Sequence, residues 1–154
     1  MQQDLSPEDA RFGLDTNKAL AHRWVDAINR RDETALRAVL SDDFLYSGMG
    51  RTPKEIAVRW HKDEFVAIVL LARTRMKKPV VMTVIRELAE GNRVVFETEG
   101  YGEMRDGFVY ANAYCLLYQI DGDKIKAVRD YCCTHTAVIA SEHATGGVTN
   151  DKTI

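Results

Sequence analysis

The residue whose type and position most suggest chemistry is Asp130, a carboxylate in a stretch of alternating apolar residues. In a strand, Val128 and Cys132 share its face, whereas Arg129 and Tyr131 point the other way. Burial of Asp130 would disfavour its charged form and raise its pKa into a range useful for acid–base catalysis. The alternative is a structural aspartate that is paired with an arginine or an amide.

Two further positions are candidates for proton transfer. Asp26 follows His22 by one helical turn, so the two side chains can share a helix face and form a hydrogen bond that relays protons. The alternative for this pair is an exposed polar helix face. His61 follows Trp60 at an expected break in a helical segment, where the mouth of a cavity could lie. A capping or solvent-facing histidine is the alternative there.

Aromatic and polar side chains are candidates for binding a substrate. Four aromatic residues could line a pocket for a flat ring, although core packing explains each of them equally well: Trp24, Tyr46, Trp60 and Tyr114. Asn112 could orient a substrate oxygen or satisfy a sheet edge. Strand parity places Thr98 inward, as a further binding candidate, and places Glu97 and Glu99 on the convex face.

Composition and motifs argue against several classes of protein. The four histidines lack the spacing of metal ligands, and no Gly-rich phosphate loop follows a strand, so we predict neither a metal nor a nucleotide cofactor. With 21 Lys and Arg against 23 Asp and Glu, no global charge attracts nucleic acid or an anionic membrane. The longest apolar run, Phe65–Ala72, is shorter than the roughly 20 residues of a membrane span.

The cysteines and the amino terminus indicate the cellular compartment. Three cysteines without CxxC spacing suggest free thiols in a reducing environment rather than a disulfide framework. The first residues are polar and lack an apolar signal core. We therefore expect a cytoplasmic protein.

The first half of the chain is predicted to be mainly helical. A helix should start at Ser6–Pro7, or restart at Asp15, and reach about Arg31. Its buried stripe is predicted to contain Leu20, Trp24, Ala27, Ile28 and Arg31.

Three further elements are expected before the sheet. Asp32 should cap a second, short helix that Asp42–Asp43 ends, and residues 44–46 should form a short strand. Residues 54–76 favour a helix with a possible kink or break between His61 and Asp63.

The second half of the chain is predicted to form strands. These span residues 80–88, 93–104, 108–120 and 124–134. Asp121–Gly122 provides the positive φ angles of a tight hairpin turn between the last two. Helices followed by an antiparallel meander predict an α+β fold with helices on one face of the sheet. We expect one domain over residues 1–139 and a loosely held tail over residues 140–154.

Several strings within this order of elements resemble the nuclear transport factor 2-like fold, in its SnoaL-like and ketosteroid-isomerase-like branch. They are HRWVDAINRRD, ALRAVLSDDF and, near the end, EGYGEM followed by DGFVYANAYCLLYQIDGDKIKAVRDY. Together they cover roughly Thr16 to Thr134. The resemblance implies a cone in which a curved antiparallel sheet wraps on N-terminal helices around an apolar cavity, and it implies a homodimer.

The subfamilies of this fold match the sequence only in part. Asp130 matches the last aspartate of limonene epoxide hydrolases, and Asp26 matches the first-helix aspartate of scytalone dehydratase. The aspartate base of ketosteroid isomerases falls at Gly48, and their tyrosine falls at Trp24. The histidine of the dehydratase falls near Met82. The fold hosts many chemistries, so the resemblance does not choose between them.

Two functions remain from this reading. The first is a small cofactor-independent enzyme in which Asp130, with Asp26 or His61, moves a proton on a small cyclic or aromatic hydrophobic substrate. Its reaction would be of the isomerase, dehydratase, polyketide cyclase or lyase type. The second is a non-catalytic ligand-binding or dimerisation module, in which Asp130 is a structural residue.

Overall fold

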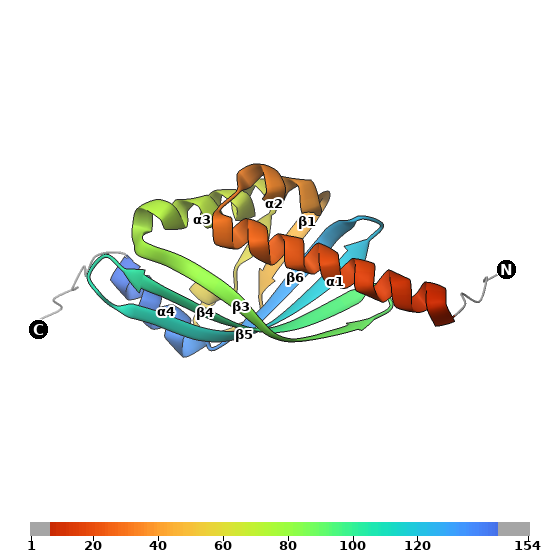
Figure 1. Ribbon diagram of the computed structural model, residues 1–154. Coiled ribbons are helices and arrows are strands. Elements are labelled where there is room, and N and C mark those ends of the chain that lie inside the picture. Colours follow the sequence, from red (N-terminus) through yellow and green to blue (C-terminus); the bar gives the residue numbers. More distant parts are fainter. Residues whose placement is uncertain (1–6, 145–154) are drawn as a thin grey trace, which may run out of the picture.

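The computed structural model describes the backbone of residues 7–144 and the side chains of residues 13–144. Over that range helices cover one face of a curved six-stranded sheet, whose strand order is β2-β1-β6-β5-β4-β3 (Figure 1). The elements are α1 (Pro7–Arg30), α2 (Glu33–Val39), β1 (Leu40–Gly48), the 3-10 turn η1 (Lys54–Ile56), β2 (Arg59–His61), α3 (Lys62–Arg75), β3 (Met76–Glu90), β4 (Arg93–Met104), β5 (Val109–Asp121), β6 (Lys124–Cys132) and α4 (Thr134–Ala144).

The predicted hairpin that carries Asp130 is confirmed. Strands β5 and β6 pair antiparallel, and Asp121 lies opposite Lys124 at the turn. Gly122 has φ of +60°, a left-handed conformation that glycine adopts without the steric cost of a Cβ atom. Across the sheet, Asp130 lies opposite Leu116 of β5. The hairpin therefore turns the Asp130 side chain toward the helices.

The sheet is mixed, which corrects the expectation of a purely antiparallel sheet. β1 runs parallel to β6, with Tyr46 opposite Val128 and Gly48 opposite Asp130. The sequence identifies strands by their alternation, but pairing between elements so far apart in the chain leaves no local pattern. This parallel contact brings the end of β1 alongside Asp130.

The first two helices agree largely with the sequence, and α1 begins at Pro7, the earlier of the two predicted starts. Its predicted stripe is buried, and Arg31 follows the helix with φ of +53°. The Asp32 carboxylate accepts a hydrogen bond from the backbone N–H of Ala35 at 2.9 Å, as expected of a helix cap. The second helix ends earlier than predicted: Asp42 and Asp43 lie exposed within β1.

Residues 54–76 are not one helix with a kink, which corrects another expectation. They form the 3-10 turn η1, the short strand β2 and then α3, so the predicted break at His61 is the start of the helix itself. Strand β2 pairs with β1, placing Trp60 opposite Tyr46. Pairing with a neighbouring strand overrides the helical preference of this segment.

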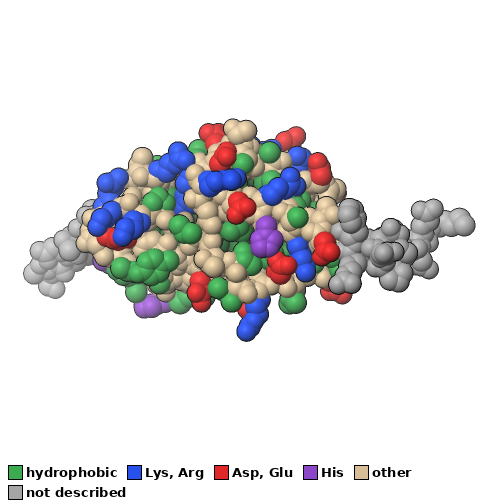
Figure 2. Space-filling view, in the orientation of Figure 1, with side chains coloured by type: hydrophobic (Ala, Val, Ile, Leu, Met, Phe, Trp, Pro, Cys, Tyr) green, Lys and Arg blue, Asp and Glu red, His purple; other side chains and the backbone are tan. Residues whose placement is uncertain are grey.

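Helices α1, α2 and α3 pack on the concave face of the sheet and bury the main core (Figure 1). A smaller cluster joins Ala140 of α4 to Met76, Met104 and Tyr110. The predicted boundary at residue 139 falls inside α4, and residues 145–154 lie outside the described range. No helix within the described residues is both long and apolar enough to cross a membrane. Basic and acidic side chains are interspersed on the face drawn in Figure 2.

Candidate functional site

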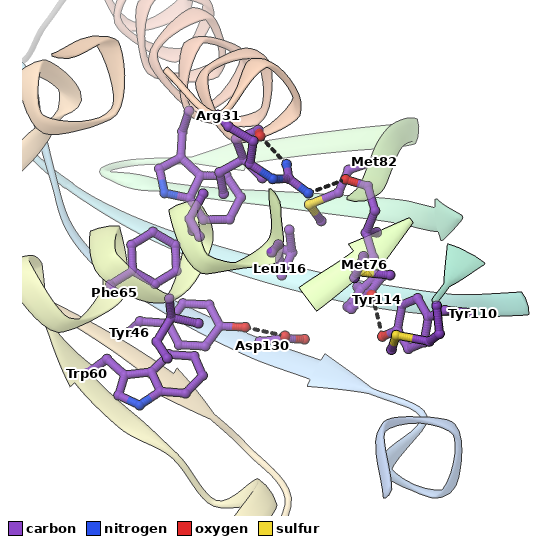
Figure 3. A pocket seen from close by; sticks show the side chains of 17 residues that line it. Arg31, Tyr46, Trp60, Phe65, Met76, Met82, Tyr110, Tyr114, Leu116 and Asp130 are labelled. Carbon is purple, nitrogen blue, oxygen red and sulfur yellow. Dashed lines mark hydrogen bonds between the residues drawn. The ribbon is translucent and has the colours of Figure 1, made fainter. Parts of the chain in front are cut away.

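A cavity of about 280 Å³ lies between the helices and the concave face of the sheet (Figure 3). Its walls come from the last turns of α1, from one side of α3 and from the inward-facing side chains of the strands. Most lining residues are aliphatic or aromatic: Trp24, Ile28, Tyr46, Trp60, Phe65, Ile68, Val69, Ala72, Met76, Val80, Met82, Met104, Tyr110, Tyr114 and Leu116. The charged lining residues are Arg31 and Asp130.

Asp130 and Tyr46 form a hydrogen-bonded pair in the wall of this cavity. The Tyr46 hydroxyl donates to Oδ2 of Asp130, as Figure 3 shows. The Tyr46 ring is held between those of Trp60, at 5.4 Å, and Phe65, at 4.9 Å, with both pairs stacked. Asp130 is only 8% exposed, and its Oδ1 is buried without a hydrogen-bond partner among the described residues. A buried carboxylate oxygen without a donor destabilises the charged form.

Burial shifts the proton affinities of both groups upward. Burial raises the pKa of the Asp130 carboxyl above its usual range, although the Tyr46 hydroxyl and the Cys132 thiol oppose the shift by favouring the charged form. Burial and then the Asp130 charge raise the pKa of Tyr46 far above its ordinary value, so this hydroxyl keeps its proton. Burial likewise raises the pKa of the Cys132 thiol, to about 12. Within this group, Asp130 is therefore the side chain whose raised pKa best suits it to exchange a proton.

Two further tyrosines form a second polar pair in the cavity wall. The hydroxyl oxygens of Tyr110 and Tyr114 lie 2.5 Å apart, and Asn112 Nδ2 donates to the Tyr110 hydroxyl at 3.0 Å. The tyrosine–tyrosine bond uses only one of the two hydroxyl protons, so the other is available to a group in the cavity. Gly100 makes room for this arrangement, because a Cβ atom there would lie 2.8 Å from the Tyr114 ring.

Asn112 links Tyr110 to the segment that follows β6. Its amide donates to the carbonyl of Cys133 at 3.2 Å and accepts from the backbone N–H of the same residue at 3.2 Å. The Asn112 side chain thus satisfies the backbone N–H and carbonyl groups of Cys133, which lies between β6 and α4. Asn112 is buried but does not line the cavity, so the structure places it as a support and not as a substrate contact.

The structure brings five of the predicted site residues together and leaves out the others. Those that line the cavity are Trp24, Tyr46, Trp60, Tyr114 and Asp130. Thr98 faces inward and is 2% exposed, but it does not line the cavity. Glu97 and Glu99 lie exposed on the opposite face, as strand parity predicted.

Asp26 and His61 lie outside the cavity, which corrects their predicted place in the site. Asp26 is exposed on α1, because the buried stripe of that helix passes through Trp24 and Ala27. His22 bonds to Glu87 of β3 at 2.6 Å, so the predicted bond from His22 to Asp26 is replaced. His61 is exposed at the start of α3, where its backbone N–H donates to Glu64 at 2.9 Å.

Several residues that line the cavity were not predicted as site residues, among them Arg31, Tyr110 and three methionines. Arg31 was predicted only as part of a buried stripe, although an arginine on such a stripe is itself a signal. Tyr110 has the same strand parity as Asn112 and Tyr114, which could have identified it. The methionines Met76, Met82 and Met104 carried no signal in the sequence, because apolar residues occur throughout the core. No cluster of three potential metal ligands is present within the described residues.

Comparison with known proteins agrees with this architecture. The fold is the nuclear transport factor 2-like cone, which ketosteroid isomerases share. The sequence matches the SnoaL-like domain family over residues 21–128, well over half of the chain, and the protein belongs to that family. None of the curated proteins matches the sequence closely enough to count as a relative.

Three solved structures illustrate the proteins that share this fold. BvnE pinacolase from Penicillium brevicompactum superposes with a TM-score of 0.74 at 15% identity, covering 85% of this chain and 95% of that one. An LEH-like epoxide hydrolase from M. tuberculosis superposes with a TM-score of 0.68 at 16% identity, covering 82% of this chain and 90% of that one. A hypothetical protein with a ketosteroid isomerase-like fold from Catenulispora acidiphila, in complex with trimethylamine, superposes with a TM-score of 0.61 at 20% identity, covering 73% of this chain and 83% of that one. At these identities the likeness shows the fold alone.

Proposed function

We propose that the protein is a cofactor-independent enzyme that transfers protons on a small cyclic or aromatic hydrophobic substrate held in the cavity. The observation that carries this proposal is the buried carboxyl of Asp130 in a cavity wall that is otherwise largely apolar. Burial raises the pKa of this group, which is the direction that favours its use as a general acid–base. The reaction is of the isomerase, dehydratase, cyclase or lyase type, each of which requires such a step.

In this mechanism the polar groups of the cavity have different roles. Ionised Asp130 accepts a proton from the substrate, and Tyr46 donates to Oδ2 to orient the carboxylate. The spare hydroxyl proton of the Tyr110–Tyr114 pair hydrogen bonds to a substrate oxygen and stabilises negative charge that develops there. Protonated Asp130 then returns the proton to another atom of the substrate or to a leaving hydroxyl.

The size and walls of the cavity suit a small substrate. At about 280 Å³ it falls just below the roughly 300–1,000 Å³ that is typical of sites for drug-sized ligands. Aromatic rings in the lining, among them Tyr46 and Trp60, suit an apolar substrate of one or two fused rings.

Deuterium exchange tests the proposed proton transfer without knowledge of the natural reaction. The protein is incubated in D₂O with 2-tetralone, a two-ring ketone with acidic C–H bonds, and exchange at the carbon next to the carbonyl is followed by NMR. We expect faster exchange than in buffer alone. Binding of 2-tetralone without any acceleration would favour the alternative function, a ligand-binding module.

Replacing Tyr46 with Phe should shift the pH dependence of this exchange. The Tyr46 hydroxyl lowers the pKa of Asp130 by favouring its carboxylate, so its loss should move the rising limb of log kcat/KM to higher pH. A hydrogen bond to a charged group is worth about 1.5–3 kcal/mol, equivalent to a shift of roughly 1–2 pH units. Tyr118→Phe is the matched control, because the buried Tyr118 hydroxyl has no hydrogen-bond partner among the described residues. If the rising limb of the pH profile lay at the same pH in Tyr46→Phe as in wild type, Tyr46 would not have this effect on Asp130.

We further propose a homodimer through the outer face of the sheet. Four large apolar side chains are exposed there, namely Val81 (53%), Ile85 (50%), Tyr101 (63%) and Tyr131 (46%). Such a surface is unusual for a face that contacts only water. Light scattering should give twice the mass of the chain, and Tyr101→Lys should reduce that mass. A monomeric wild type would contradict the proposal.

We also propose that the protein is cytoplasmic, because its three cysteines are free thiols, which suit a reducing compartment.

A further inference from the structure

Arg31 places a buried guanidinium in the wall of the cavity. The residue is only 6% exposed. Nη1 donates to the carbonyl of Ile28, and Nη2 donates to the carbonyl of Val80 at 2.7 Å. Nε is buried without a hydrogen-bond partner among the described residues. The two carbonyls satisfy part of the hydrogen-bonding capacity of Arg31, but they bring no negative charge to offset it.

No carboxylate within the described residues forms an ion pair with Arg31. Burial, and then the charge of Arg73, lower the pKa of the guanidinium, and no anionic group opposes that shift. Arg73 lies on α3 and donates to the backbone carbonyl of Arg31 at 2.9 Å, so it adds a second positive charge nearby. Asp130 bonds to Tyr46 at another wall of the cavity (Figure 3). An arginine stays charged in proteins, and a buried charge without a counter-ion is costly.

The end of α1 does not by itself require an arginine at position 31. Arg31 has φ of +53°, the left-handed conformation at the end of a helix that glycine adopts most readily. A glycine would therefore end the helix without burying a charge. The arginine side chain turns inward from this position, to the cavity.

We propose that Arg31 binds a carboxylate of the substrate, which makes the substrate a small cyclic or aromatic acid. A guanidinium matches the geometry and charge of a carboxylate, and burial strengthens that interaction. The carboxylate lies toward the end of α1, and the reacting atom lies toward Asp130. The reaction at Asp130 rests on the proposed function, whereas the anion site stands on the surroundings of Arg31.

Calorimetric titration with benzoate and benzamide tests the anion site apart from catalysis. The two probes have nearly the same shape and differ in charge. Wild type should bind benzoate at least about 10-fold more tightly than benzamide, the effect of one charged hydrogen bond. Arg31→Met should abolish this preference, and Arg31→Lys should keep part of it. Arg73→Met, which removes a neighbouring charge outside the cavity lining, should reduce it only slightly.

The outcomes separate this inference from the proposed function. Asp130→Asn should bind benzoate as well as wild type or better, because a negative charge has left the same cavity, even though deuterium exchange on 2-tetralone is lost. Absence of benzoate binding, equal affinity for the two probes, or an unchanged preference in Arg31→Met would each overturn the assignment. If circular dichroism shows that Arg31→Met is unfolded, the wild-type comparison and Arg31→Lys decide.

Discussion

Replacing Asp130 with Asn should lower the catalysed exchange rate by about 10²–10⁴-fold, the usual contribution of a general acid–base. The amide has nearly the same shape as the carboxyl and can still accept the hydrogen bond from Tyr46, but it cannot take up a proton at neutral pH. The rate is measured by NMR in D₂O, and folding by circular dichroism. The loss should appear in kcat rather than in binding of the ketone.

Asp121→Asn is the matched control for this variant. It makes the same chemical change at an exposed position of the same hairpin, where Asp121 lies 3.9 Å from Lys126. Its exchange rate should equal that of wild type. A folded Asp130→Asn variant with the wild-type rate would remove Asp130 from the mechanism.

Replacing Phe44 with Ala should cost about 3–5 kcal/mol of stability. Phe44 is fully buried, with its ring 5.3 Å from that of Phe65, and it does not line the cavity. Truncation leaves a void where α3 packs on β1. The loss is a large share of the roughly 5–15 kcal/mol that stabilises a typical domain. Urea denaturation followed by circular dichroism measures it.

Phe44→Leu provides the comparison, because it retains most of the buried volume. It should cost less than about 1.5 kcal/mol. If Phe44→Ala were no less stable than Phe44→Leu, the packing between α3 and β1 would not contribute as the structure indicates.

The sequence predicted elements and faces better than it predicted partners. Alternation along β4 and β6 placed Thr98 and Asp130 on the inner face, and both are buried. Burial on that face does not imply contact with the cavity, because packing against neighbouring side chains also buries a residue. Thr98 and Asn112 were assigned to binding although they do not line the cavity.

The errors share a physical cause, which is contact between segments distant in sequence. Helical spacing predicted a bond between His22 and Asp26. Instead, His22 Nε2 bonds to Oε2 of Glu87 on β3 at 2.6 Å. Residues 59–61 favoured a helix, but pairing with β1 holds them as a strand. Neither partner leaves a signal in the local pattern. The bond between Tyr46 and Asp130, 84 residues apart, could not be anticipated for the same reason.

The position of β6 within the sheet has a consequence for how the chain reaches its native state. β6 is the last strand in the sequence, yet it lies between β1 and β5, not at an edge. During synthesis the side of β1 that pairs with β6 therefore stays unpaired until nearly the whole domain has emerged. The bond between Tyr46 and Asp130 joins β1 to β6, so it can form only after this last strand has been made and has entered the sheet.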